Sequence, residues 1–174
     1  MESFEIKFRV TNTDPTIPLQ LQVCIDDQTL DSVTVTDVKH CAYNVTLADG
    51  DHELKLIMSG KTTDHTVLDP QGQIVTDAML EFANVELDEI NIDTMLQSLA
   101  VYTHDFNGTG DQVHDQFYHA MGCNGTASLK FTTPVYLWLL ENMSAKYWHD
   151  HNCNHARWIP PFSCRTPCFI RLST

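Results

Sequence analysis

The chain has 174 residues, enough for one domain with a proper core and a short extension. Its net charge is −13, from 23 acidic and 10 basic residues. A body this acidic repels phosphate backbones, so we expect no nucleic-acid partner. Since no apolar run is long enough to span a bilayer, we expect no membrane insertion.

The first ninety residues predict a series of short antiparallel strands. Apolar and polar residues alternate in segments that are separated by turn residues about every ten positions. The turn signal at Ala48–Asp51 predicts a hairpin between two of these strands. The expected strands are Phe4–Val10, Leu19–Ile25, Leu30–Val38, Cys41–Leu47, His52–Met58, Thr66–Leu68, Ile74–Ala78, Met79–Val85 and Glu86–Ile92.

The next fifty residues mix helical and strand signals. Asp93–Val101 fits either a short helix or a strand, and Asp111–Met121 predicts a weakly amphipathic helix. Ala127–Phe131 predicts a strand. The apolar segment Pro134–Met143 is either a final strand or a short helix, and its side chains are expected to pack into the core. The predicted fold is mainly β: a jelly-roll-like antiparallel β-sandwich, with one or two short helices near the C-terminal third.

Composition changes near residue 143. Residues 1–143 carry 22 acidic and 6 basic residues, whereas residues 144–174 carry 1 acidic and 4 basic residues and three of the six cysteines. We therefore expect a β-sandwich domain over 1–143 and a Cys/His/Arg-rich tail over 144–174. Side chains in this tail offer ligand chemistry for a zinc site, namely His149, His151, Cys153, His155, Cys164 and Cys168. The other cysteines are expected as free thiols.

The densest polar chemistry lies between residues 99 and 134. Asp105, Asn107, Thr109 and Asp111 alternate around glycines, which resembles the way a calcium loop gathers oxygens around a hard cation. These four residues are the predicted metal ligands, with Ca²⁺ as the expected ion. The alternative is a glycine-rich turn closed by its own side-chain hydrogen bonds.

Aromatic residues in the same segment could stack on sugar rings. Tyr102, Phe106, Phe117 and Tyr118 are the candidates, with core packing as the alternative. Tyr102 and Phe106, together with Asn107, form the predicted carbohydrate-binding set. Four loop aspartates could form a second cation or sugar site, namely Asp49, Asp51, Asp69 and Asp77.

The ingredients of a hydrolase also lie in this segment. Cys123 sits in a glycine-rich turn, and three histidines are near it in sequence: His104, His114 and His119. A Cys–His pair needs spatial adjacency that a sequence does not show. Without a nucleophile elbow, phosphate loop or paired glycosidase carboxylates, we expect no enzyme and no catalytic residues.

Residues 19–92 carry a family pattern. A strand at Asp49–Met58 is followed by a polar loop, then by Asp69–Asp77 and paired strands. This pattern resembles the small calcium-dependent xylan-binding modules, which are jelly-roll sandwiches. The resemblance implies a site in which calcium and sugar hydroxyls come together in a loop.

Residues 50–143 carry a second resemblance, in the runs Tyr102–Gly110, Met121–Thr126 and Leu129–Met143. These runs are similar to uncharacterised proteins of tailed bacteriophages, cyanophages among them, which are usually taken as virion or tail components. The resemblance implies a non-enzymatic structural or adhesion module of a phage virion, either a head decoration or a tail or fibre component. The alternative is a calcium-dependent carbohydrate-binding module.

The phage hypothesis also predicts location and partners. The N-terminal residues lack a basic segment followed by an apolar stretch, so we expect no signal peptide, and assembly into a virion in the host cytoplasm. The expected partners are further copies of the chain in a homo-oligomer, other virion proteins, and a cell-surface glycan.

Overall fold

The structure is a computed structural model that describes residues 1–152, with side chains for residues 1–143. These residues form an antiparallel β-sandwich with two α-helices in its second half, which confirms the predicted fold class. In chain order, the elements are β1 (Glu2–Asn12), β2 (Leu19–Ile25), β3 (Gln28–Val35), β4 (Val38–Leu47), β5 (Gly50–Ser59), a 3₁₀ turn (Thr63–His65), β6 (Thr66–Leu68), β7 (Ile74–Asp77), β8 (Leu80–Leu87), β9 (Ile90–Asn91), α1 (Asp93–Leu99), β10 (Val101–His104), β11 (Val113–Gln116), β12 (Ala120–Met121), β13 (Gly125–Thr133) and α2 (Val135–Asn152).

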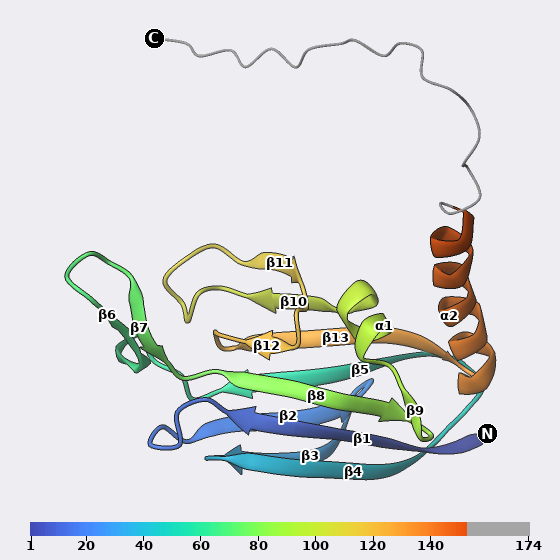
Figure 1. Cartoon of the computed structure of the whole chain (residues 1–174). Coiled ribbons are helices and arrows are strands. Elements are labelled where there is room, and N and C mark those ends of the chain that lie inside the picture. Colours follow the sequence, from blue (N-terminus) through green and yellow to red (C-terminus); the bar gives the residue numbers. More distant parts are fainter. Residues whose placement is uncertain (153–174) are drawn as a thin grey trace, which may run out of the picture.

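Two sheets face each other across the core (Figure 1). Sheet A has the strand order β12-β8-β1-β4, with β9 paired to β8, and sheet B has the order β11-β10-β13-β5-β2-β3. The strands β6 and β7 form a separate two-stranded hairpin that projects from one end of the sandwich (Figure 1). In sheet B, β13 from late in the chain lies beside β5 from its first third, and β10 and β11 follow on the other side of β13.

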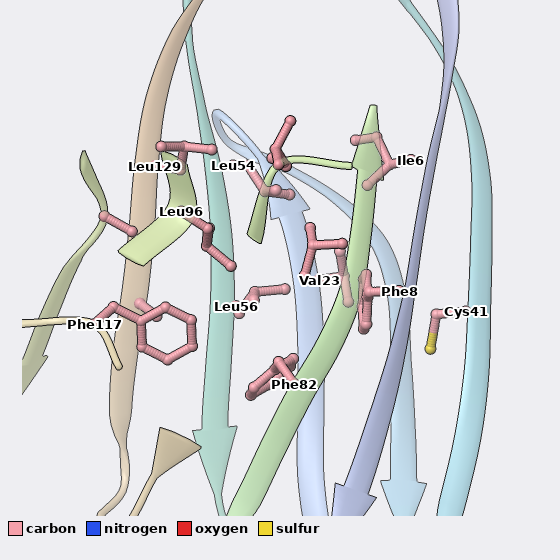
Figure 2. Close-up of a cluster of buried hydrophobic side chains, with 14 of the residues drawn as sticks. Ile6, Phe8, Val23, Cys41, Leu54, Leu56, Phe82, Leu96, Phe117 and Leu129 are labelled. Atoms are coloured by element: carbon pink, nitrogen blue, oxygen red, sulfur yellow. The ribbon is translucent and has the colours of Figure 1, made fainter. Parts of the chain in front are cut away.

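Alternating apolar residues build the core. The inward side chains of β1 are less than a tenth exposed, as are Leu54, Leu56 and Met58 of β5. Burying one large aliphatic or aromatic side chain contributes about 1.5–3 kcal/mol, so the alternation determines which face of each strand turns inward. Figure 2 shows this cluster between the sheets, where the labelled residues include Ile6, Phe8, Val23, Phe82 and Leu129.

The predicted hairpin at Ala48–Asp51 is wrong. The strand β4 pairs with β1 in sheet A, whereas β5 pairs with β2 and β13 in sheet B, so this linker crosses between the sheets. The side chain of Thr133 holds the crossover: its hydroxyl donates to Ala48 O at 2.6 Å and accepts from Gly50 N–H at 3.0 Å. As a central strand of sheet B, β5 buries Leu54, Leu56 and Met58 in the core.

The helix predicted over Asp111–Met121 is also wrong. Val113–Gln116 forms β11 and pairs with β10, and Ala120–Met121 forms β12 and pairs with β8. Between them Phe117 is fully buried, and its N–H donates to Ala100 O at 3.2 Å. Strand pairing and one buried ring outweigh the weak helical preference of this segment, because an isolated helix of this length is marginal.

The two segments predicted as either helix or strand, Asp93–Val101 and Pro134–Met143, are mainly helical. Asp93–Leu99 forms α1, which buries Met95 and Leu96. In α2, Val135, Trp138 and Leu139 pack inward, but Tyr136 and Leu137 are more than half exposed, so the expected core packing applies to one face.

The helix α2 runs across the predicted domain boundary after Met143. The carboxylate of Glu2 accepts a hydrogen bond from Val135 N–H at 2.7 Å, which ties its start to β1. Within the described part of the chain, no helix has the length and hydropathy to cross a bilayer.

Candidate functional site

The residues from 99 to 134 form a hollow at the edge of sheet B. Its volume is about 430 Å³, and we call it the β10–β12 hollow. The side chains that line it include Tyr102, His104, Asp115, Gln116, Tyr118 and Cys123. They come from β10, β11 and the turns on either side of β12, so strand pairing brings together residues up to 21 positions apart.

A row of aromatic rings lies along one wall of the hollow, with Tyr102 and His104 tilted by 35° and Phe106 edge to face with His104 at 83°. Tyr102 and His104 are two positions apart on β10 and share one face of the strand, and their ring centroids lie 4.6 Å apart. Phe106 continues the row, with its centroid 4.7 Å from that of His104. The hydroxyl of Tyr102 donates to Cys123 O and accepts from Cys123 N–H at 3.0 Å. Because Tyr102 is only 7% exposed, its ring is a wall of the site rather than a free stacking surface.

Tyr118 supplies the exposed ring. It is 63% exposed, and its hydroxyl donates to Gln116 Oε1 at 2.9 Å. The amide of Gln116 donates in turn to Gln97 O at 2.7 Å, just after the middle of α1. These two hydrogen bonds hold an aromatic ring in a fixed position at the surface, where one face can contact a ligand.

His104 and Asp115 form the polar edge of the hollow. Nδ1 of His104 accepts from Phe106 N–H at 3.4 Å, which leaves Nε2–H to donate to Asp115 Oδ2 at 3.3 Å. The side chain of Asp115 is 61% exposed, so its other oxygen faces solvent. The hollow therefore combines a free carboxylate oxygen, an amide and an exposed ring.

The hollow does not have the geometry of a cysteine hydrolase. Both ring nitrogens of His104 are occupied as described, so neither is placed to take a proton from the Cys123 thiol. Burial raises the pKa of Cys123, although nearby Lys61 acts in the opposite direction. A raised pKa keeps the group a thiol, which is a weak nucleophile.

The other two histidines lie elsewhere. His114 Nδ1 is 2.8 Å from Thr103 Oγ1 on β10, and His119 Nε2 donates to Asp93 O at 2.7 Å. Phe117 belongs to the core. The structure therefore does not bring the predicted histidines together in one place.

The turn from Asp105 to Asp111 uses most of its candidate ligands to hold itself. Asp105 Oδ1 accepts from Gly108 N–H at 2.9 Å, and Thr109 Oγ1 donates to Phe106 O at 2.7 Å. Asn107 Oδ1 accepts from Asn124 N–H at 2.7 Å, which joins this turn to the next one.

Asp111 is exposed. As placed, these four side chains do not gather the six or more oxygens that Ca²⁺ takes. Calcium binding by Asp105, Asn107, Thr109 and Asp111 stays a prediction.

The four loop aspartates lie in separate surroundings. Asp49 pairs with the N-terminal amine at 3.3 Å, Asp69 closes its own turn, and Asp77 pairs with Lys61. Asp51 lines a different hollow beside His52. Within the side chains described, no group of three or more His, Cys, Asp and Glu residues is arranged to hold a metal ion.

The three cysteines in the described part of the chain are free thiols, as expected. Cys24 and Cys41 are free and buried, and Cys123 is free and partly buried. The zinc ligands predicted in the tail lie outside the residues whose side chains are described.

The sequence did not predict a role for Lys61, nor for Asp115 and Gln116 of the hollow. The side chain of Lys61 is 1% exposed, and its Nζ lies 2.5 Å from both Asp77 Oδ1 and Gly122 O. The side chain of Asn124 bonds the backbone of Lys61 on both sides, through Lys61 N–H at 2.9 Å and Lys61 O at 2.7 Å. Lys61 therefore supports the turn that carries Cys123, which lines the hollow. Its position in a polar loop gave no sign of burial.

No protein-family model matches the chain, and no curated protein matches its sequence. Two solved structures are similar to it. One is the selenomethionine form of vCBM60, described with two families of calcium-dependent carbohydrate binding modules linked by circular permutation. It is 12% identical, with a TM-score of 0.48, over 72% of this chain and 89% of that chain. The other is vCBM60 in complex with galactobiose, at 12% identity and a TM-score of 0.44, over 72% of this chain and 96% of that chain.

Proposed function

We propose that this chain is a non-catalytic carbohydrate-binding module that binds a sugar in the β10–β12 hollow. The observation that carries the proposal is the exposed ring of Tyr118, held by Gln116 beside the carboxylate of Asp115. An aromatic face packs on the C–H face of a sugar, and polar groups at its edge bond the hydroxyls.

The charges favour a neutral sugar. The chain carries −13, and Asp115 leaves one carboxylate oxygen open at the edge of the hollow. A uronic or sialic acid would bring a like charge against this edge, which lowers the rate of encounter and costs binding energy. A neutral oligosaccharide has no such penalty, and its hydroxyls can donate to the carboxylate.

We further propose that the module belongs to a phage virion. An adhesion module of a virion would use such a hollow to bind a cell-surface glycan. This part rests on the resemblance of residues 50–143 to phage proteins.

The test is an array of neutral and acidic oligosaccharides, followed by isothermal titration with the strongest neutral binder. We expect Tyr118→Ala to raise its Kd at least about tenfold, which corresponds to about 1.4 kcal/mol. The matched control is Tyr136→Ala, because Tyr136 is a similarly exposed tyrosine (59%) on α2. Binding by no neutral sugar, or equal Kd values for the wild type and Tyr118→Ala, would overturn the proposal.

A further inference from the structure

The β6–β7 hairpin carries the most concentrated exposed apolar surface among the described strands. Four aliphatic residues lie within nine positions: Val67 and Leu68 on β6, and Ile74 and Val75 on β7. They are 50–63% exposed. We infer that this hairpin is the surface through which two copies of the chain associate. This inference does not depend on the proposed sugar binding.

The strand edges of the hairpin are available for pairing. In the described residues, β6 and β7 pair with each other and with no third strand. The hairpin also projects beyond the end of the sandwich (Figure 1), so another chain can reach it. Unpaired edges with exposed apolar side chains are templates for a further strand. The pairing has one register irregularity, between Val67 and Leu68, and neither strand carries a charged side chain before Asp77 at the base.

The base of the hairpin is firmly held. Asp77 Oδ1 accepts from Thr66 Oγ1 and Lys61 Nζ, each at 2.5 Å, and Asp77 O accepts from Thr13 Oγ1 at 2.7 Å. Ala78 N–H donates to His65 O at 3.2 Å. Because these bonds fix both strands at their shared end, the apolar residues are presented in a preformed arrangement. A preformed surface loses less conformational entropy on association than a mobile loop.

The charges identify a second copy as the partner. Between Thr66 and Thr76 the only charged residue is Asp69, in a chain with a net charge of −13. Asp69 Oδ1 is occupied by Gln71 N–H at 2.9 Å and Gln73 N–H at 2.8 Å. A basic partner would find almost no carboxylates here, and would be drawn to the rest of the surface. Two copies of an acidic protein can approach most closely where each has least charge.

A two-fold arrangement of two hairpins would cover the apolar patch and also pair the free strand edges. When two identical hairpins meet across a two-fold axis, the same apolar patch faces itself, and such an isologous contact closes at two copies. Joining one free edge from each hairpin would extend the two-stranded sheet to four strands. The acidic bodies would repel, so salt that screens this repulsion strengthens the dimer.

The experiment is sedimentation velocity on the full chain from about 5 to 500 μM, at low and high salt. We expect dimer to increase with concentration, and more strongly at high salt. The variant Ile74→Asp should weaken the dimer at least about tenfold. The matched control Val38→Asp changes a similarly exposed valine (51%) on β4 and should dimerise like the wild type.

Thermal melts of both variants check folding, and Ile74→Thr provides a milder change that keeps a β-branched residue. A wild-type chain that stays monomeric at every concentration overturns the inference, as does an Ile74→Asp variant that dimerises normally. Sugar titration of Ile74→Asp separates the two proposals, because the hollow is intact in this variant. If Ile74→Asp loses the dimer but binds sugar as the wild type does, the result supports dimerisation through the hairpin independently of the proposed sugar binding.

Discussion

At each end of β5 a poorly exposed basic side chain pairs with a carboxylate, but the two pairs differ in chemistry. Beyond the last residue of β5, Lys61 pairs with Asp77, and the two side chains are 1% and 14% exposed. Near its first residue, His52 pairs with Asp26, at 10% and 45% exposure. His52 and Lys61 are nine positions apart, at most roughly 30 Å along extended chain, so the two pairs act independently.

The partners of each pair show what it supports. Lys61 also donates to Gly122 O, which joins the hairpin base to the β10–β12 hollow. The two ring nitrogens of His52 face two acceptors, Asp26 Oδ2 at 2.8 Å and Ala48 O at 2.9 Å. The ring can donate to both only when it carries two protons. The Lys61 pair thus supports the hairpin and the hollow. The His52 pair instead makes the bond to the crossover after β4 depend on the protonation of His52.

The largest effect is expected at Lys61. The variant Lys61→Met removes the cation and leaves the Asp77 carboxylate poorly exposed without its partner. Breaking one side of a buried pair costs about 3–5 kcal/mol, so we expect a loss of that size in the free energy of unfolding, measured by urea denaturation.

The double variant Lys61→Met, Asp77→Leu is the control for this experiment. Replacing both charges with apolar groups is often close to neutral, so it should recover much of the loss. Equal stability of the wild type and Lys61→Met would show that the pair at this end contributes no more than an exposed one.

A smaller, pH-dependent effect is expected at His52. Hydrogen bonds to Asp26 and to Ala48 O raise the pKa of His52. Partial burial raises the pKa of Asp26, but bonds from His52 and Glu53 N–H outweigh it and leave this pKa below its usual value.

The stabilisation from His52 is therefore complete below its ordinary pKa of about 6.5, and is lost as pH rises through the raised value. The stabilisation from Asp26 is present above about pH 3.9, and is lost as pH falls through the lowered value. The pair stabilises most between about pH 4 and 6.5.

Urea denaturation from pH 5 to 9 measures this dependence. Because Asp26 is nearly half exposed, we expect its pair with His52 to contribute about 1 kcal/mol at most. The variant His52→Gln should remove this part of the fall in stability above pH 6.5, whereas the control His40→Gln, at an exposed histidine on β4, should keep it. An unchanged profile in His52→Gln would contradict the assignment.

The smallest effect is expected from calcium at the turn Asp105–Asp111. Asn107 in this turn bonds Asn124, which in turn bonds the backbone of Lys61. Since Asn107 and Thr109 are engaged in hydrogen bonds, 10 mM Ca²⁺ should change the free energy of unfolding by less than about 0.5 kcal/mol relative to EDTA. Sugar binding should likewise survive EDTA. A larger stabilisation that Asp105→Asn removes would instead establish the predicted calcium site.

The candidate site was predictable in part. Its segment was identified from its polar residues and glycines, and Tyr118 was among the aromatic candidates. Asp115 and Gln116 were missed because Asp111–Met121 predicted a helix. Phe106 and Asn107 lie near the hollow, but the amide oxygen of Asn107 bonds Asn124, and Tyr102 is buried. Which side chains face a hollow depends on strand pairing, and the local pattern here did not specify it.

The sequence by itself determined most strands of the first ninety residues and their inward faces. Leu19–Ile25 was predicted with the bounds it has, and Leu54, Leu56 and Met58 face the core as expected. Alternation specifies a face because side chains point to opposite sides at each step, but it does not specify a partner. Only the tertiary structure decided that β4 and β5 belong to different sheets, that Lys61 is buried, and that Tyr118 stands beside Asp115. Each of these depends on contacts between residues that are remote in sequence or in separate strands.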